Sequence, residues 1–137
     1  MEKVRRFSIS IEKELLKKFD RYLKEKKYPT RSKAIEDLIR SALVEKEWLE
    51  GKEVAGSIVL VYNHNKRELV AKITHIEHDF HDIILSSQHI HLDHENCLEI
   101  IAVKGEPSKI EELRNRLRAT KGIKHCSLTM ATTGREV

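Results

Sequence analysis

Apolar and polar residues alternate along the start of the chain, from Arg5 to Ile11. The two faces of this segment carry Phe7, Ile9 and Ile11 on one side and Arg6, Ser8 and Ser10 on the other. This period of two is typical of a β-strand. No second strand pattern follows nearby, and a strand with unpaired backbone groups favours pairing with another copy of itself. We therefore predict that residues 5–11 form a ribbon with a second chain.

The pattern changes to a helical period over residues 12–26, where the apolar residues form one stripe. Pro29 disfavours a helical Tyr28 and so ends this helix, and Thr30 is a suitable N-cap for the next one. The second apolar stripe consists of Ala34, Ile35, Leu38, Ile39, Ala42 and Leu43. About 45 residues in the order strand–helix–helix are marginal as a monomer but sufficient for an intertwined dimer.

A charged junction at residues 45–53, in which Trp48 is expected to pack between domains, precedes a new pattern. The new pattern has the order β-α-β-β-α-β, which is that of the ferredoxin-like, split βαβ domain. Capping boxes are expected at Asn65/Glu68 and Ser108/Glu111. The expected strands are 55–63, 82–92, 97–105 and 123–132. The fold class is thus α+β, with domains at 1–47 and 54–133, a linker at 48–53 and a loose tail at 134–137.

Composition and charge narrow the class of protein. The 137 residues are 39% hydrophobic and 35% charged, and no apolar run approaches the roughly 18 residues of a membrane-spanning helix. The first residues lack the apolar segment of a signal peptide. Two cysteines far apart in sequence favour a reducing compartment, so we expect a cytoplasmic protein.

The net charge of +4 lies entirely in the first third of the chain. Residues 1–51 contain fourteen Lys and Arg against ten Asp and Glu, whereas residues 52–137 contain twelve of each. A basic segment followed by a neutral one indicates that the first segment meets a polyanion such as DNA.

Histidine is concentrated in the second domain, where residues 78–97 contain five of the eight histidines together with Cys97. The alternation in QHIHL projects His89 and His91 to one face of a strand, and a hairpin would return the Cys97 sulfur beside them. Two nitrogen ligands and one sulfur ligand suit Ni, Cu, Zn or Co rather than Mg or Ca. The alternative is a surface strand that carries histidines next to an unrelated cysteine.

The strand–helix–helix segment resembles a ribbon-helix-helix DNA-binding domain, in which a two-stranded ribbon enters the major groove. The resemblance implies that Arg6, Ser8 and Ser10 read base edges. It also implies that the start of the second helix, near Thr30 and Arg31, contacts phosphate. The alternative is a solvated strand face in a plain dimerisation module.

A ribbon-helix-helix domain followed by a βαββαβ domain with the spacing His78, His89, His91, Cys97 resembles the nickel-responsive NikR repressors over essentially the whole chain. The resemblance implies one Ni(II) per chain, held by the three hairpin residues and by His78 from a second subunit. It further implies a homotetramer, a dimer of dimers with a central core of four ACT-like regulatory domains. Such a protein would bind a palindromic double-stranded operator, repress nickel-uptake genes and need no membrane.

One position departs from this family, whose members often carry an acidic residue where Lys33 stands, one turn before Asp37. That acidic residue helps to form a second cation site, so Lys33 puts the site in doubt. Other functions compete with this interpretation: a ribbon-helix-helix regulator that senses Cu, Co, Zn or a small molecule, and a metalloenzyme. A catalytic metal needs an open coordination position and a nearby acid or base. We find no nucleophile–base pair, glycine-rich phosphate loop or paired carboxylates, and therefore expect no enzyme.

Overall fold

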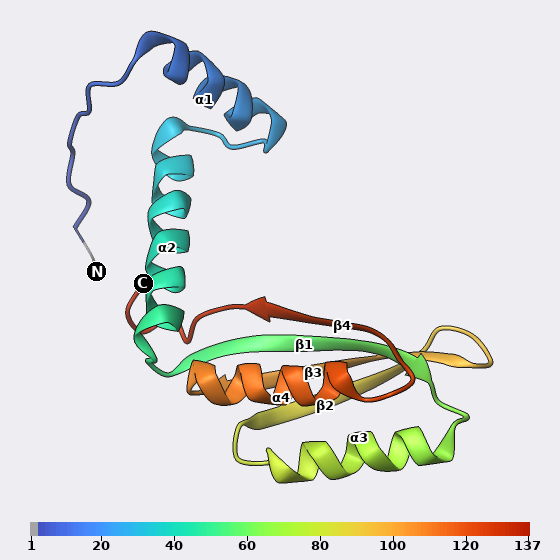
Figure 1. The fold of residues 1–137 in the computed structure, drawn as a ribbon. Helices are drawn as coiled ribbons and strands as arrows, with labels where there is room; N and C mark the ends of the chain where they lie inside the picture. Colours follow the sequence, from blue (N-terminus) through green and yellow to red (C-terminus); the bar gives the residue numbers. More distant parts are fainter. Residues whose placement is uncertain (1–2) are drawn as a thin grey trace. The chain divides into compact units, whose positions relative to one another are not determined.

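The computed structural model describes residues 3–137 of the chain, so the first two residues of the expected N-terminal domain lie outside the described residues (Figure 1). The chain divides into two compact units, residues 1–40 and residues 41–137. The division falls inside a helix, whereas we expected domain boundaries at 47 and 54, and those boundaries remain a prediction. Among the described residues, no helix is both long and apolar enough to cross a membrane.

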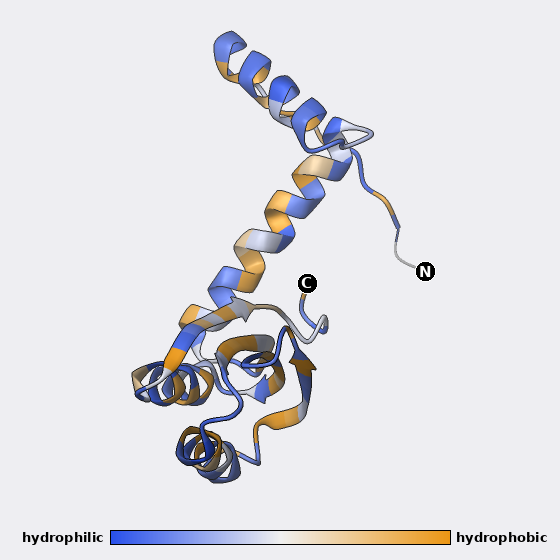
Figure 2. Cartoon of the chain, turned by 90° about the vertical axis from the view of Figure 1, so that its right-hand side faces the viewer, coloured by the Kyte–Doolittle hydropathy of each residue, from blue (hydrophilic) through white to orange (hydrophobic). Residues whose placement is uncertain are grey.

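The first unit contains α1 (Lys13–Glu25) and the beginning of α2 (Arg31–Glu50). The apolar residues of α1 follow one side of the helix (Figure 2). The Thr30 hydroxyl accepts a hydrogen bond from the backbone N–H of Lys33 at 3.1 Å, which confirms Thr30 as the cap of α2. A cap of this kind satisfies one of the amide groups that the first turn leaves free.

Residues 3–12 contain no assigned strand, so the ribbon expected at 5–11 is not formed in the single chain. The physical reason is that a strand is defined by its ladder of hydrogen bonds, and one copy of this segment has no second copy to pair with. The apolar face of the segment is correspondingly open, with Phe7 69% and Ile9 59% exposed.

The second unit contains a four-stranded sheet in the order β2-β3-β1-β4, in which every neighbouring pair is antiparallel. Its elements are β1 (Val54–Asn63), α3 (Arg67–Asp79), β2 (Ile84–His91), β3 (Asn96–Gly105), α4 (Pro107–Ala119) and β4 (Ile123–Met130). This order confirms the predicted βαββαβ domain, and both helices cover the same face of the sheet (Figure 1).

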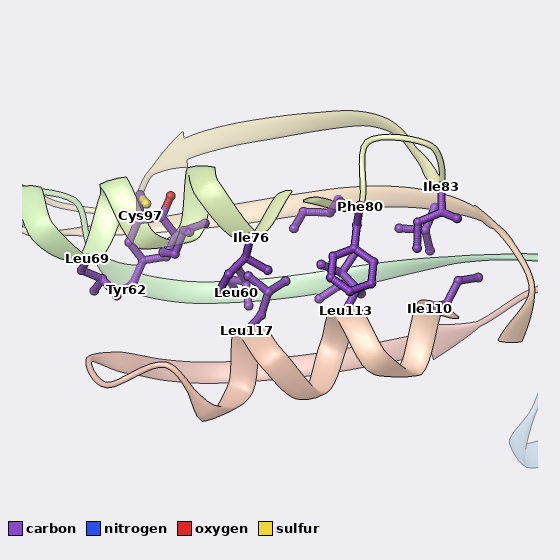
Figure 3. Packing of buried hydrophobic residues seen from close by; sticks show 14 of the residues in the cluster. Leu60, Tyr62, Leu69, Ile76, Phe80, Ile83, Cys97, Ile110, Leu113 and Leu117 are labelled. Carbon is purple, nitrogen blue, oxygen red and sulfur yellow. The ribbon is translucent and has the colours of Figure 1, made fainter. Parts of the chain in front are cut away.

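The core of this unit lies between the sheet and the two helices. Alternate residues of β1 and β3, such as Ile58, Leu60 and Ile101, are fully buried there (Figure 3). They meet the apolar stripes of the helices, made of Leu69, Ile73 and Ile76 from α3 and Ile110, Leu113 and Leu117 from α4. Successive side chains of a strand project to opposite faces of the sheet, so the same alternation determines on which face each predicted metal ligand lies.

Both predicted capping boxes of this unit are wrong. The helix α3 begins after Lys66 and the helix α4 begins after Glu106, and neither start has a side-chain cap. The Asn65 side chain instead donates to the carbonyl of His94. Pro107 opens α4, where its fixed backbone angle suits the first helical turn and its missing N–H costs nothing.

The junction also differs from expectation, because α2 continues as a helix to Glu50. The Trp48 indole belongs to the core of residues 41–137, which corrects the expectation that it packs between domains. Its N–H donates to the carbonyl of Ala131 at 2.8 Å, and the Thr132 hydroxyl donates to Glu47 at 2.9 Å. The segment after β4 is therefore fixed to the last turns of α2.

Candidate functional site

The β2–β3 hairpin brings the three candidate metal ligands of one chain to the same side of the sheet. In the register of the hairpin, His91 lies opposite Cys97 and His89 lies opposite Glu99. Directly opposed residues of an antiparallel pair project to the same face, and this face is the one that the helices cover. The predicted hairpin geometry is thereby confirmed.

The turn between His91 and Cys97 is held by its own side chains. Asp93 accepts hydrogen bonds from the backbone N–H groups of Asn96 at 2.7 Å and of Glu95 at 2.9 Å. These backbone bonds hold the pKa of Asp93 below its usual range, because they stabilise the carboxylate form. The Lys124 ammonium donates to the Asn96 side chain at 2.7 Å, which ties the turn to β4.

Cys97 is almost fully buried, and burial raises the pKa of its thiol, although a hydrogen bond with Tyr62 partly opposes this effect. A buried thiol remains protonated at neutral pH, so a metal that binds it must displace the proton. The second cysteine, Cys126, lies on β4, and its thiol donates to the carbonyl of Arg114 at 3.7 Å. The two sulfurs therefore occupy different surroundings.

A tyrosine and a buried glutamate lie beside His89. The Tyr62 hydroxyl donates to a Glu99 carboxylate oxygen at 2.7 Å, and Nδ1 of His89 lies 3.4 Å from that hydroxyl and 3.6 Å from the carboxylate. With Nδ1 turned toward these groups, Nε2 is the ring nitrogen that remains for a metal. Groups that orient the second nitrogen of a ligating histidine in this way are a regular part of metal sites.

Glu99 is fully buried and shares its surroundings with Glu77 of α3. Burial, reinforced by a hydrogen bond with Glu99, raises the pKa of Glu77 to about 9. At neutral pH the Glu77 carboxyl group is therefore protonated. This pair of carboxylates was not predicted from the sequence, where the available signal was the position of Glu99 on the same face of β3 as Cys97 and Ile101.

The fourth candidate ligand, His78, lies on α3 and is exposed. Its ring stacks on that of His81, with 5.7 Å between centroids. Among residues 3–137, no group of three or more His, Cys, Asp or Glu is placed so that it could hold a metal ion. One chain thus aligns His89, His91 and Cys97 on one face but does not close a site. In chemical terms, three imidazoles and one thiolate fit a borderline transition metal.

The candidate DNA-binding residues lie in the first unit. Arg6, Ser8 and Ser10 are exposed. The Arg31 guanidinium donates through Nε and Nη2 to the two carboxylate oxygens of Asp20, both at 2.9 Å. This bidentate pair lowers the pKa of Asp20. It also leaves further N–H groups of Arg31 unused.

Lys33, the position that departs from the family pattern, forms an ion pair with Asp37. The ammonium donates to the carboxylate at 2.9 Å, one helical turn away. This hydrogen bond, together with a weaker one from Tyr28, lowers the pKa of Asp37. The acidic side chain of Asp37 is therefore already neutralised by a cationic group of the chain itself.

Two family models match the chain. The model described as "NikR C terminal nickel binding domain" matches residues 55–131, and that described as "Ribbon-helix-helix protein, copG family" matches residues 5–46. A solved structure of an uncharacterized protein from Thermotoga maritima has a TM-score of 0.53 at 14% identity. It covers 58% of this chain and 98% of that one, and this likeness concerns the fold alone.

Full-length relatives agree with the family models. Proteins from Syntrophus aciditrophicus, Chlorobaculum parvum and Thermococcus onnurineus are 54%, 51% and 49% identical to the chain. The alignments cover 98%, 96% and 98% of this chain and 98%, 98% and 99% of the relatives, each named "Putative nickel-responsive regulator". Regulators of this kind are not enzymes. The chain belongs to the NikR family of nickel-responsive transcription regulators, with a ribbon-helix-helix DNA-binding domain and an ACT-like nickel-binding domain.

Proposed function

We propose that the chain is a repressor of nickel-uptake genes that binds its operator when Ni(II) occupies a site shared between subunits. The observation that carries this proposal is the hairpin register, which aligns His89, His91 and Cys97 on one face. In the proposed site these three residues and His78 of the partner subunit hold one Ni(II) per chain. Ni(II) favours a planar set of four such ligands.

The need for a second chain is supported by the placement of His78. It lies on α3, whereas the other three ligands lie on the hairpin, and one chain does not gather all four. A ligand supplied by the partner links metal binding to assembly, since neither chain alone completes the site. The protein's affinity for nickel then depends on the arrangement of its subunits, and by linkage nickel favours that arrangement.

Two exposed apolar surfaces support the proposed homotetramer. In the first unit, Ile9, Ile11, Leu15 and Leu38 line an open apolar groove of about 570 Å³, which a second copy of the segment would fill. In the second unit, the face of the sheet opposite α3 and α4 carries apolar side chains that are only half-buried. They are Val59, Val61, Ile90, Leu98 and Ile100. We assign the groove to the DNA-binding dimer and the sheet face to the central core of four domains.

The DNA-binding part of the proposal has two classes of contact. Arg6, Ser8 and Ser10 read bases from a ribbon formed by two chains, and Thr30 and Arg31 at the start of α2 contact phosphate. Two identical strands impose two-fold symmetry, so the operator is a palindrome in double-stranded DNA. The protein acts in the cytoplasm, where this DNA is found.

Nickel titration tests the metal site. Ni(II) should produce a thiolate-to-metal absorption band and a diamagnetic spectrum that saturate at one ion per chain. Cys97→Ala should abolish the band, whereas the matched control Cys126→Ala should leave it intact. A band that survives in Cys97→Ala and disappears in Cys126→Ala would mean that the proposed hairpin site is wrong.

Operator binding tests the regulatory role of the same site. Palindromic operator DNA should be bound tightly by the nickel-loaded protein and weakly after the metal is removed with a chelator. Parallel measurements on protein loaded with Zn(II) or Cu(II) show whether the increase in operator affinity is specific to nickel. Equal operator affinity with and without every metal would refute metal-dependent repression.

A further inference from the structure

His64 immediately follows β1 and lies against the candidate ligand His91. The two imidazole rings stack with 4.3 Å between their centroids and 30° between their planes. The two residues come from different parts of the domain, because His64 opens the β1–α3 connection and His91 ends β2. One face of the His91 ring is therefore covered by a side chain that the predicted ligand pattern does not contain.

The same residue also holds the turn that separates His91 from Cys97. Nε2 of His64 lies 2.9 Å from the carbonyl oxygen of His94, and its backbone N–H donates to the carbonyl of Glu95 at 2.9 Å. Asn65 adds a third bond, from its side-chain amide to the His94 carbonyl at 2.9 Å. His64 and Asn65, which lie outside the hairpin, thus stabilise the β2–β3 turn by hydrogen bonds.

The hydrogen bond to the His94 carbonyl shows which nitrogen of the His64 ring carries a proton. A carbonyl oxygen can only accept, so Nε2 of His64 must carry a proton and donate it. The other ring nitrogen, Nδ1, is buried and meets no hydrogen-bond partner among residues 3–137. Neither nitrogen of His64 therefore offers an accessible lone pair to a metal ion.

We propose that His64 is a positioning residue of the metal site and not one of its ligands. Its ring restricts the rotation of the His91 imidazole, and its Nε2–H holds the turn that sets the distance from His91 to Cys97. Both effects order the ligands before the metal arrives, so less conformational entropy is lost on binding. This inference rests on the proposed nickel site, since it assigns His91 as a ligand.

The test compares three substitutions with a matched control. His64→Ala removes the ring and the donor, His64→Phe keeps a ring without the donor, and His64→Gln keeps a donor without the ring. Lys66→Ala is the control, because Lys66 lies in the same β1–α3 connection as His64 and its side chain is exposed. Nickel affinity is measured by competition with a chelator, and the thiolate-to-metal band is recorded for each nickel-loaded variant.

His64→Ala should weaken nickel binding about 10- to 100-fold, as the loss of outer-shell partners does, while the absorption band persists because all four ligands remain. His64→Phe should lose less affinity than His64→Gln, since the ring lies directly on His91. Nickel affinity in His64→Ala equal to that in Lys66→Ala would overturn the inference. Loss of the band in His64→Ala with Cys97 intact would also overturn it, because His64 would then be a ligand.

A measurement on the metal-free protein separates this inference from the nickel site itself. The ring current of His64 should shift the ring-proton NMR signals of His91, and His64→Ala should remove that shift while His64→Phe retains one. If the wild type gives no nickel band but the shift is present, the proposed function fails and the stacking stands. If the ring-current shift is absent, the positioning role of His64 is refuted, whether or not the protein binds nickel.

Discussion

The two compact units bury their apolar side chains in different ways. In residues 41–137 the stripes of two helices close over one face of a four-stranded sheet, and residues such as Ile58, Ile110 and Leu113 are fully buried. In residues 1–40 comparable side chains stay open, with Leu15 52% and Leu38 49% exposed. A unit of this size cannot surround its own core. The regulatory unit is thus complete as a fold, whereas the DNA-binding unit leaves apolar side chains open, as we expect of a unit that pairs with a second chain.

The strongest test of this contrast is truncation of a buried leucine in the second unit. Leu113→Ala should lower the free energy of unfolding by about 2–5 kcal/mol, because it removes a fully buried side chain and leaves a cavity. The loss should be independent of protein concentration. Denaturant unfolding followed by circular dichroism at two protein concentrations measures both quantities.

The matched substitution in the first unit is Leu38→Ala, in the open groove. Its effect should grow as the protein is diluted, because the side chain is buried only by a partner chain. Operator affinity should fall while the nickel absorption band is unchanged. A concentration-independent loss of stability in Leu38→Ala would show that the first unit folds without a partner.

The contrast can be sharpened within the DNA-binding unit by separating base reading from phosphate contact. Arg6→Ala should cost about 1–3 kcal/mol of operator binding and relax the sequence preference, as the loss of a base contact does. Arg31→Ala should weaken binding to all sequences alike and reduce the salt dependence. Equal losses of specific and non-specific affinity in Arg6→Ala would refute its role in reading bases.

The raised pKa of Glu77 gives the regulatory unit a pH dependence opposite in sign to that of the first unit, where the pKa values of Asp20 and Asp37 are lowered. Because the pKa of Glu77 rises from 4.5 to about 9 on folding, the folded state binds a proton more tightly than the unfolded state. Wild-type stability therefore decreases as pH rises from about 5 to 9. Glu77→Gln should flatten this decrease and be more stable than wild type at pH 8, by on the order of 1 kcal/mol.

Thermal unfolding of the metal-free wild type and Glu77→Gln between pH 5 and 9 tests whether wild-type stability decreases as pH rises. The advantage of Glu77→Gln over wild type should shrink toward pH 5, where both side chains are neutral. An advantage that grows toward low pH would show that Glu77 is ionised in the folded state. The measurement uses metal-free protein because Glu77 directly precedes the candidate ligand His78.

The sequence predicts those features that depend on local pattern. The order βαββαβ, the cap at Thr30 and the common face of His89, His91 and Cys97 follow from periodicity within one or two elements. The continuation of α2 to Glu50 was not predicted. Its buried side consists of Val44, Glu47 and Trp48, and a glutamate in the sequence indicates a solvent-exposed position rather than a buried one.

Contacts between distant elements could not be predicted in the same way. The pairing of Glu77 with Glu99 and the stacking of His64 on His91 depend on how α3 and the β1–α3 connection pack against the hairpin. No spacing in the chain encodes those distances. The ribbon expected at residues 5–11 is a different case, since its pattern is plain but the partner that we predict for its hydrogen bonds is another copy of the chain.

The smallest predicted effect concerns Lys33 in the first unit. Its ammonium already donates to Asp37 at 2.9 Å, which is where a bound cation would neutralise that carboxylate. The pair is solvent-exposed and stabilises the helix only weakly. We expect its main effect to be that the start of α2 does not need an added ion. Operator binding by the nickel-loaded wild type should therefore be the same in potassium, sodium and lithium at fixed ionic strength.

Lys33→Glu should acquire a requirement for one cation, because two carboxylates one turn apart on a helix repel each other unless an ion lies between them. Lys33→Gln is the matched control: it removes the ammonium without adding a second carboxylate, and it should show at most a weak preference. The measurement is operator affinity for the three proteins across the same series of salts. A wild type that already needs one specific cation would show that the Lys33–Asp37 pair does not substitute for a bound ion.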